Sequence, residues 1–190
     1  MTGPSFERIV EGIRGCVVRE DLDLRVRTSV RIGQTVRLWA EPQDAGALGE
    51  LVKACAANNR RYAVIGSGTN VLVSGRCTDM VFIHLSAAAF SAIAAGSGFL
   101  RAGAGATIAQ VLAVCQQQGL SGLEFLAGVP GTVGGAVVMN AGQGEGERAI
   151  GDTVARVRVM DSSGQARQLT RGEIPFGYQI GRASCRERVY

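Results

Sequence analysis

Two glycine-rich loops contain the residues with the clearest potential for chemistry. The first consists of Gly66, Ser67, Gly68, Thr69 and Asn70 and follows a short apolar run. Glycines let backbone N–H groups converge on an anion, and the three polar side chains add further donors. Such a concavity would suit a pyrophosphate. A plain turn between two strands explains the same residues at least as well.

Two better-known phosphate motifs do not fit this loop. In a dinucleotide fingerprint of the G-x-G-x-x-G type, the third glycine position would fall on Val71. A Walker-type loop would require a Gly-Lys-Ser/Thr run, which is absent here. The loop therefore belongs to neither class.

The second glycine-rich stretch is longer and leads into Asn140. Its candidate ligand-binding residues are Gly128, Val129, Pro130, Gly131, Thr132, Gly134, Gly135 and Asn140. Each glycine would weaken a regular helix or strand by roughly 0.5–1 kcal/mol, so a compensating role is expected. One such role is close approach of the backbone to a flat or anionic ligand. A tight crossover between two lobes is an equally good explanation.

Other reactive side chains give weaker signals. His84 alternates with Phe82 along a strand, which favours a packed or surface histidine over a general base. The five cysteines are widely spaced without a C-x-x-C pair, so we expect neither a metal site nor disulfides. Cys55 and Cys115 fall on apolar faces of predicted helices, where buried thiols are common.

The elements that position the first loop are predicted from apolar periodicity. Residues 36–40 form a strand, and Asp44 caps a helix that ends near residues 58–59. A strand at 62–65 runs directly into the loop. Further strand-like runs follow at 71–73 and 81–85.

The second half of the chain mixes helices and strands. Residues 86–98 are small and predict a connection, and 99–102 predict a strand. Thr107 caps a helix that ends at Gly119. Strands at 154–160 and 165–169 flank a turn. Because strands and helices do not alternate strictly, the pattern indicates an α+β fold.

Composition excludes several classes of protein. Hydrophobic residues make up 46 % of the 190 residues and charged residues 19 %, as in globular chains. The net charge of +4 comes from scattered arginines, which favours a solvated surface over a nucleic-acid interface. No long apolar run or signal-peptide pattern opens the chain, so we expect a cytoplasmic protein without membrane contact.

Four motifs in order resemble one family. Residues 65–73 and 128–142 are similar to the two flavin-binding signatures of UDP-N-acetylenolpyruvoylglucosamine reductases, also called UDP-N-acetylmuramate dehydrogenases. Residues 27–33 resemble an upstream motif of that family, and 176–178 resemble the lead-in to its catalytic arginine. The resemblance covers about residues 25–178.

This resemblance implies a two-lobed FAD-binding domain of the vanillyl-alcohol oxidase type, also called the PCMH type. The lobes are expected at residues 1–86 and 98–178, with both glycine loops binding FAD. The family uses NADPH to reduce the enolpyruvyl ether of UDP-N-acetylglucosamine to UDP-N-acetylmuramate in peptidoglycan synthesis. A serine protonates the substrate, and an arginine and a glutamate stabilise charge.

The chain departs from the family near its end. Gln179 stands at the position of the family's arginine, and no segment matches the substrate domain with the serine and glutamate. We therefore expect a truncated chain without turnover. Residues 180–190 resemble the in-frame translation of a sequencing adapter beginning AGATCGGAAGAGC, which would also explain Gln179. A frayed basic C-terminus is the alternative. Without this tail the net charge would be +2.

Two other functions remain open. An oxidase of the same flavin superfamily would use dioxygen instead of NADPH. A flavin-binding module would hold FAD without turnover. The Met139–Gly142 run and the short N-terminal segment favour the reductase over the oxidase.

Overall fold

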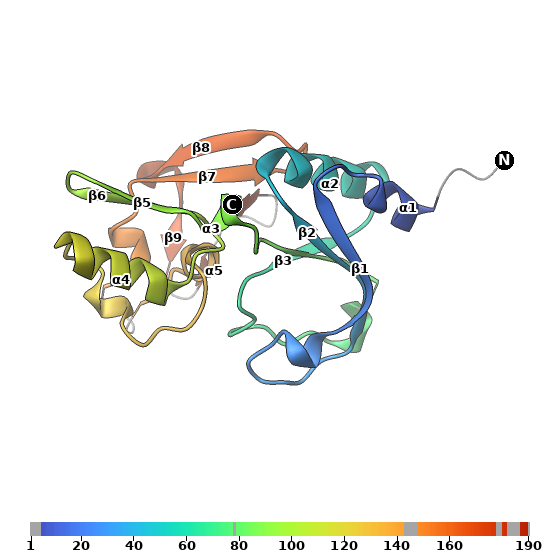
Figure 1. The fold of residues 1–190 in the computed structure, drawn as a ribbon, viewed down its shortest axis with the longest axis horizontal. Helices are drawn as coiled ribbons and strands as arrows, with labels where there is room; N and C mark the ends of the chain where they lie inside the picture. The colour runs from blue at the N-terminus through green and yellow to red at the C-terminus, as the bar shows by residue number, and fades with distance from the viewer. Residues whose placement is uncertain (1–4, 78, 143–147, 178–179, 182–186, 190) are drawn as a thin grey trace.

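A computed structural model describes residues 5–77, 79–142, 148–177, 180–181 and 187–189. It has two halves that lie side by side (Figure 1). The first half carries β1 to β4 with helices α1 and α2. The second carries α4, α5 and the strands from β5 onward.

The first half is built on a four-stranded sheet in the order β1-β2-β4-β3. Its strands are β1 (Cys16–Asp23), β2 (Thr35–Pro42), β3 (Tyr62–Ile65) and β4 (Val81–His84). β2, β4 and β3 are parallel, and β1 pairs antiparallel with β2. The carboxyl ends of three neighbouring strands therefore meet at one edge of this sheet.

Helix α2 (Ala45–Ala57) packs on this sheet, and α1 (Phe6–Glu11) lies beside it. The predicted cap is confirmed, because the Asp44 carboxylate accepts a hydrogen bond from the Ala47 N–H at 2.8 Å. The apolar face of α2 is buried, including Leu48, Leu51, Val52 and Cys55.

The second half begins with α3 (Ala88–Ser91) and a hairpin of β5 (Ile93–Gly96) and β6 (Phe99–Ala102). Helix α4 (Ile108–Gln118) follows, and both predicted ends are confirmed. Thr107 and Gln110 form a capping box, and Gly119 ends the helix in the left-handed region at φ 63°.

Helix α5 (Val133–Met139) precedes a second sheet in the order β11-β7-β8. Its strands are β7 (Arg156–Asp161), β8 (Ala166–Thr170) and β11 (Glu187–Val189), while β9 (Phe176–Gly177) pairs with β10 (Ile180–Gly181). Short 3₁₀ helices connect these elements at Leu24–Val26, Gly75–Cys77, Glu124–Leu126, Ile150–Asp152 and Arg171–Glu173.

The structure corrects two predictions of secondary structure and contains elements that were not predicted. Residues 71–73 lie in a loop, because none of their backbone groups pairs with a strand. The segment at 86–98 is more than a connection, since it contains α3 and β5. β1 and α5 were not predicted, because neither has the apolar periodicity that identifies a strand or a helix.

One hydrophobic core joins the two halves. It includes Leu48 and Leu51 of α2 together with Val159 and Met160 of β7. Gly49 of α2 lies against Gly164 in the turn between β7 and β8, where an added Cβ at Gly49 would approach the Gly164 carbonyl oxygen to 2.9 Å. The lobe boundaries at residues 86 and 98 stay a prediction. Among the described residues, no helix is long and apolar enough to cross a membrane.

Candidate functional site

Three polar or glycine positions meet at the carboxyl edge of the first sheet. Glu41 lies near the end of β2, His84 ends β4, and Gly66 directly follows β3. His84 is the register partner of Ile65, so it lies next to the start of the first glycine loop. Ligands commonly bind at the carboxyl ends of parallel strands, which makes this edge a candidate binding site.

A cavity of about 880 Å³ lies at this edge. It is lined by most of segment 23–31, by Gly66 and Ser67, and by the side chains of Trp39 and His84. Its volume is within the range of roughly 300–1,000 Å³ that small-molecule and cofactor sites occupy. The first glycine loop therefore contributes Gly66 and Ser67 to this cavity.

The cavity wall carries an excess of positive charge. Arg25 is paired with Asp23 through an Nη2–Oδ2 contact of 2.7 Å, whereas Arg27 and Arg31 make no ion pair among the described residues. The Arg27 guanidinium lies 5.4 Å from the centre of the Trp39 ring. Its Nε is buried and has no hydrogen-bond partner within the part of the chain that the structure describes. A buried donor without a partner is costly, so this atom suits an anionic ligand.

The first loop is tied to segment 27–29. The Ser29 N–H donates to the Gly68 carbonyl oxygen at 3.1 Å. Gly68 has a φ of +64°, and an added Cβ there would collide with the Arg27 carbonyl oxygen. Gly68 is thus required by the packing of the protein itself. Asn70 is exposed and does not line the cavity.

The two glycine loops touch each other. The Thr69 hydroxyl donates to the Pro130 carbonyl oxygen at 3.3 Å. An added Cβ at Gly66 would collide with the Thr132 hydroxyl. Thr132 itself is buried and caps α5, where its Oγ1 accepts from the Gly135 N–H at 3.3 Å.

The second loop does not line the cavity, and several of its residues have structural roles. An added Cβ at Gly134 would lie 2.8 Å from the Ala104 Cβ, and the Gly134 N–H already donates to the Ala104 carbonyl oxygen at 2.8 Å. This geometry supports the tight crossover as the reason for Gly134. Gly128 and Gly131 have φ values of +81° and +135°, which favour glycine.

The remaining predicted residues of the second loop also contact protein. Val129 packs against the main core. Asn140 is buried at the end of α5 with a φ of 46°, and its Oδ1 accepts from the Gly151 N–H at 3.0 Å. Gln179 lies outside the described residues.

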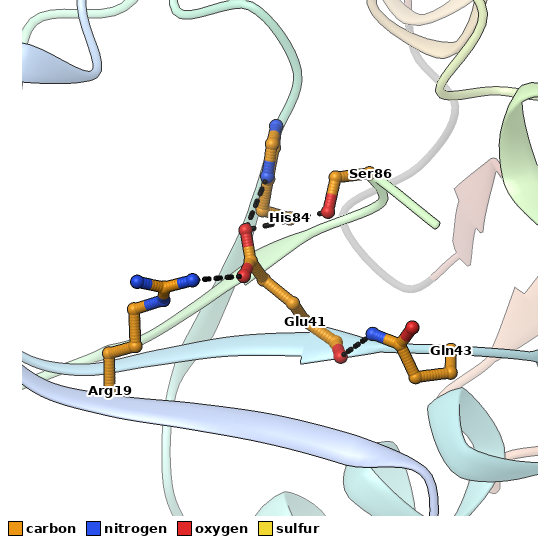
Figure 2. Close-up of polar contacts among 5 residues, drawn as sticks. All are labelled: Arg19, Glu41, Gln43, His84 and Ser86. Atoms are coloured by element: carbon orange, nitrogen blue, oxygen red, sulfur yellow. Dashed lines mark hydrogen bonds and ion pairs between the residues drawn. The ribbon is translucent and has the colours of Figure 1, made fainter. Parts of the chain in front are cut away.

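A buried carboxylate holds His84 at the cavity wall. Figure 2 shows Glu41 at the centre of a polar cluster that also includes Arg19 and Ser86. His84 Nδ1 lies 3.0 Å from Glu41 Oε1, Ser86 Oγ lies 3.4 Å from the same oxygen, and Arg19 Nη2 lies 3.6 Å from Oε2. The ring of Trp39 contacts His84 with ring centres 5.1 Å apart.

The Glu41 carboxyl is ionised at neutral pH. Burial acts to raise its pKa, but the hydrogen bond with His84 and the nearby Trp39 and Arg19 outweigh burial and hold the pKa below the ordinary value. Trp39 contributes through the proximity of its Nε1, which makes no hydrogen bond among the described residues. The serine bonds to Glu41 and not to His84, so this cluster is not a nucleophilic triad.

Glu41, His84 and Arg27 were not predicted as site residues from the sequence. Position at the end of a strand could have identified Glu41 and His84. Both lie near the ends of predicted strands that neighbour the strand entering the first loop. Arg27 belongs to the motif at residues 27–33, but its position over Trp39 depends on contacts distant in sequence.

Comparison with known proteins decides the family. The family described as an FAD binding domain matches residues 36–170. The chain belongs to this family of FAD-binding domains. Its mixed helices and strands also agree with the predicted α+β fold of the vanillyl-alcohol oxidase type.

Curated relatives of this FAD-binding domain confirm the resemblance to the reductases. The chain is 36 % identical over 161 residues to UDP-N-acetylenolpyruvoylglucosamine reductase of Syntrophobacter fumaroxidans, covering 82 % of this chain and 46 % of that protein. It is 37 % identical over 163 residues to the reductase of the same name from Rhodopirellula baltica, covering 86 % and 53 %. The chain thus spans about half the length of these relatives.

Solved structures agree with the fold. The FAD-binding domain matches UDP-N-acetylenolpyruvylglucosamine reductase from Thermus caldophilus with a TM-score of 0.71 and 27 % identity, covering 92 % of this chain and 59 % of that one. A solvent-stable cholesterol oxidase matches with a TM-score of 0.63 and 19 % identity, over 82 % and 33 %. The second match shows the fold alone.

Proposed function

We propose that the cavity at the carboxyl edge of the first sheet binds part of FAD. The observation that carries this proposal is the buried, unpartnered Nε of Arg27 beside Gly66 and Ser67 in a cavity with excess positive charge. FAD is a dianion with a pyrophosphate, and arginine with hydroxyl and backbone donors is a suitable set for it. The residues present therefore fit the cofactor that the family implies.

Arg27, Ser67 and the backbone at Gly66 would hold the cofactor in this proposal. The Trp39 ring keeps the Arg27 guanidinium in place by a cation–π contact. The second loop contributes by fixing the first, through the contact of Gly66 with Thr132 and the hydrogen bond from Thr69 to Pro130. Direct contacts of residues 128–135 and Asn140 with FAD stay a prediction.

We further propose that the whole protein is a flavin oxidoreductase of peptidoglycan synthesis. Its reaction would be the NADPH-dependent reduction of UDP-N-acetylglucosamine enolpyruvate to UDP-N-acetylmuramate. FAD would supply hydride transfer between the two substrates. The named relatives support this proposal, and the 190 residues alone are expected to hold FAD without turnover.

The first experiment is an FAD titration of the purified chain, followed by desalting and a visible spectrum. We expect a flavin spectrum that stays with the protein. Arg27→Gln should raise the Kd for FAD about tenfold, because a charge-assisted hydrogen bond is lost. Arg61→Gln is the matched control, since Arg61 pairs with exposed Asp79 and does not line the cavity.

Two results would contradict this proposal. A folded chain that takes up no flavin would exclude FAD binding by these residues. An equal Kd for wild type and Arg27→Gln would show that FAD does not bind at Arg27. For the whole protein, oxidation of NADPH that depends on the enolpyruvyl substrate distinguishes the reductase from an oxidase of the same superfamily, which would consume dioxygen.

A further inference from the structure

We propose that His84 is a ligand-contacting residue of this cavity and that Glu41 is its positioning residue. In this arrangement His84 Nε2 accepts a hydrogen bond from a hydroxyl or N–H group of FAD. The inference rests on the proposed binding of FAD in the cavity. It adds a side chain that neither glycine loop contains.

The orientation of the imidazole follows from the Glu41 carboxylate. Glu41 is 8 % exposed and ionised, so it can only accept hydrogen bonds. The 3.0 Å contact therefore places a proton on His84 Nδ1. In the neutral ring this leaves Nε2 as an acceptor, at the end of the imidazole that points away from Glu41 in Figure 2.

The surroundings restrict how far the ring can move. Trp39 contacts the imidazole, and Arg19 and Ser86 hold the Glu41 carboxylate from two other directions. The His84 side chain keeps 21 % of its surface exposed and lines the cavity. Since Nδ1 is engaged with the buried carboxylate, the edge carrying Nε2 is the polar part left to face a ligand.

A structural role alone would not require this arrangement. Glu41 already has a compensating cation in Arg19 and a hydrogen-bond donor in Ser86. A hydrogen bond from a donor group of the ligand to the imidazole better explains why this polar ring lies at the wall of a binding cavity. If the histidine contacts the ligand, the Kd for FAD should depend on pH. If the histidine serves the fold alone, the Kd should not depend on its protonation.

His84 is the only histidine in the chain, which makes the test unambiguous. The groups that face it are Glu41, Arg19, Trp39 and Ser86, and Asp23, Arg25, Arg27 and Arg31 line the same cavity. Arginine guanidinium groups are always protonated in proteins, and hydrogen-bonded partners hold the pKa values of the Glu41 and Asp23 carboxyls below their ordinary range. Among these side-chain types only imidazole ordinarily changes its charge between about pH 5.5 and 8, so a change of FAD affinity in this range points to the imidazole.

The experiment measures the Kd of the full chain for FAD across this pH range, with thermal unfolding of each apoprotein as a folding check. In the wild type we expect the Kd to rise on acidification, because protonated Nε2 no longer accepts. His84→Phe keeps a ring against Trp39 and should raise the Kd at pH 8 about three- to tenfold, as expected for one lost hydrogen bond. His84→Gln retains an acceptor that does not titrate, so its Kd should be close to that of wild type at pH 8 and independent of pH.

The role of Glu41 has its own spectroscopic readout. The ¹⁵N spectrum of the single imidazole should report Nδ1 as the protonated nitrogen in wild type, and Glu41→Ala should lose this preference together with FAD affinity. Glu41→Gln offers an amide oxygen that accepts from Nδ1 and should restore part of both.

Three outcomes would overturn the inference. The first is an unchanged Kd in a folded His84→Phe variant. The second is a wild-type Kd that falls on acidification, since that would indicate a histidinium paired with phosphate. The third is a wild type that takes up no FAD at any pH, which would remove the proposed function as well. Uptake that is insensitive to His84 would remove this inference alone.

Discussion

Gly66 lies directly against the side chain of Thr132, so the two glycine loops form one packed unit. An added Cβ at Gly66 would collide with Thr132 Oγ1 and would also lie 3.3 Å from its Cγ2. Thr132 is buried and caps α5. The glycine at the end of β3 is thus explained by a contact with the other half of the molecule.

Replacement of Gly66 by alanine should lower the free energy of unfolding by about 1–3 kcal/mol, the usual cost of an overpacked buried contact. Chemical denaturation measures this change. Gly172→Ala is the control, because an added Cβ there meets no atom within 4 Å, and its effect should stay within about 0.5 kcal/mol.

A double-mutant cycle tests the same contact from the other side. Thr132→Ala alone should cost about 1 kcal/mol through loss of the helix cap. Combined with Gly66→Ala it should cost less than the sum of the two, since the collision is relieved. Strict additivity would show that the two residues do not touch.

Asn140→Ala should destabilise the protein by about 1–3 kcal/mol, because the buried Gly151 N–H loses its acceptor. Asn140→Asp keeps an oxygen at this position and should recover part of the loss. Thermal unfolding measures both variants. If Asn140 serves the fold alone, the Kd for FAD of the folded variants stays at the wild-type value. A large increase in Kd with unchanged stability would show the direct cofactor contact predicted from the sequence.

Glu41 should make stability depend on pH in the acid range. The pKa of its carboxyl is lower in the folded protein than the ordinary 4.5, so the unfolded chain binds the proton more readily. The stabilisation is complete above about pH 4.5 and is lost as the pH falls through the lower folded value. The difference in Tm between wild type and Glu41→Gln should therefore narrow on acidification below pH 4.5. A constant difference down to pH 3 would contradict the assignment.

The thiols of Cys55, which is buried, and Cys16, which is partly buried, should react slowly. Burial raises the pKa of Cys16 to about 11 and that of Cys55 to about 12. The thiolate is the nucleophile, so both residues should react with a thiol reagent at pH 8 far more slowly in the folded protein than in denaturant. Peptide mapping after brief labelling measures this, and rapid modification of Cys55 in the native protein would contradict its burial.

Residues 180–190 stay a predicted non-native tail. The pairing of β11 with β7 uses backbone groups at a sheet edge, which any extended segment can supply. Genomic DNA read across codons 179–190 should depart from the present sequence and show an arginine codon at position 179. An unbroken match through the same codons would mean that the tail and Gln179 are native.

Local signals in the sequence specify several of the helices and strands. Asp44 and Thr107 cap the helices they were predicted to cap, Gly119 ends α4, and the apolar runs of β3 and β4 form strands. Caps, turns and apolar periodicity act within a few residues, so they can be read without the fold. The ordered motifs also identified the family, because four of them in sequence are specific.

The contacts between residues distant in sequence depend on the tertiary packing. α5 forms within a glycine-rich run because the N–H groups of Val133 and Gly134 donate to carbonyl groups of residues 104–106. No local sequence pattern predicts these contacts. The parallel pairing of β2 with β4 places Glu41 beside His84. The path of the segment between β1 and β2 places the Arg27 guanidinium over the Trp39 ring. Each of these pairs joins positions distant in the chain. Their chemistry therefore depends on packing that is set by the whole fold.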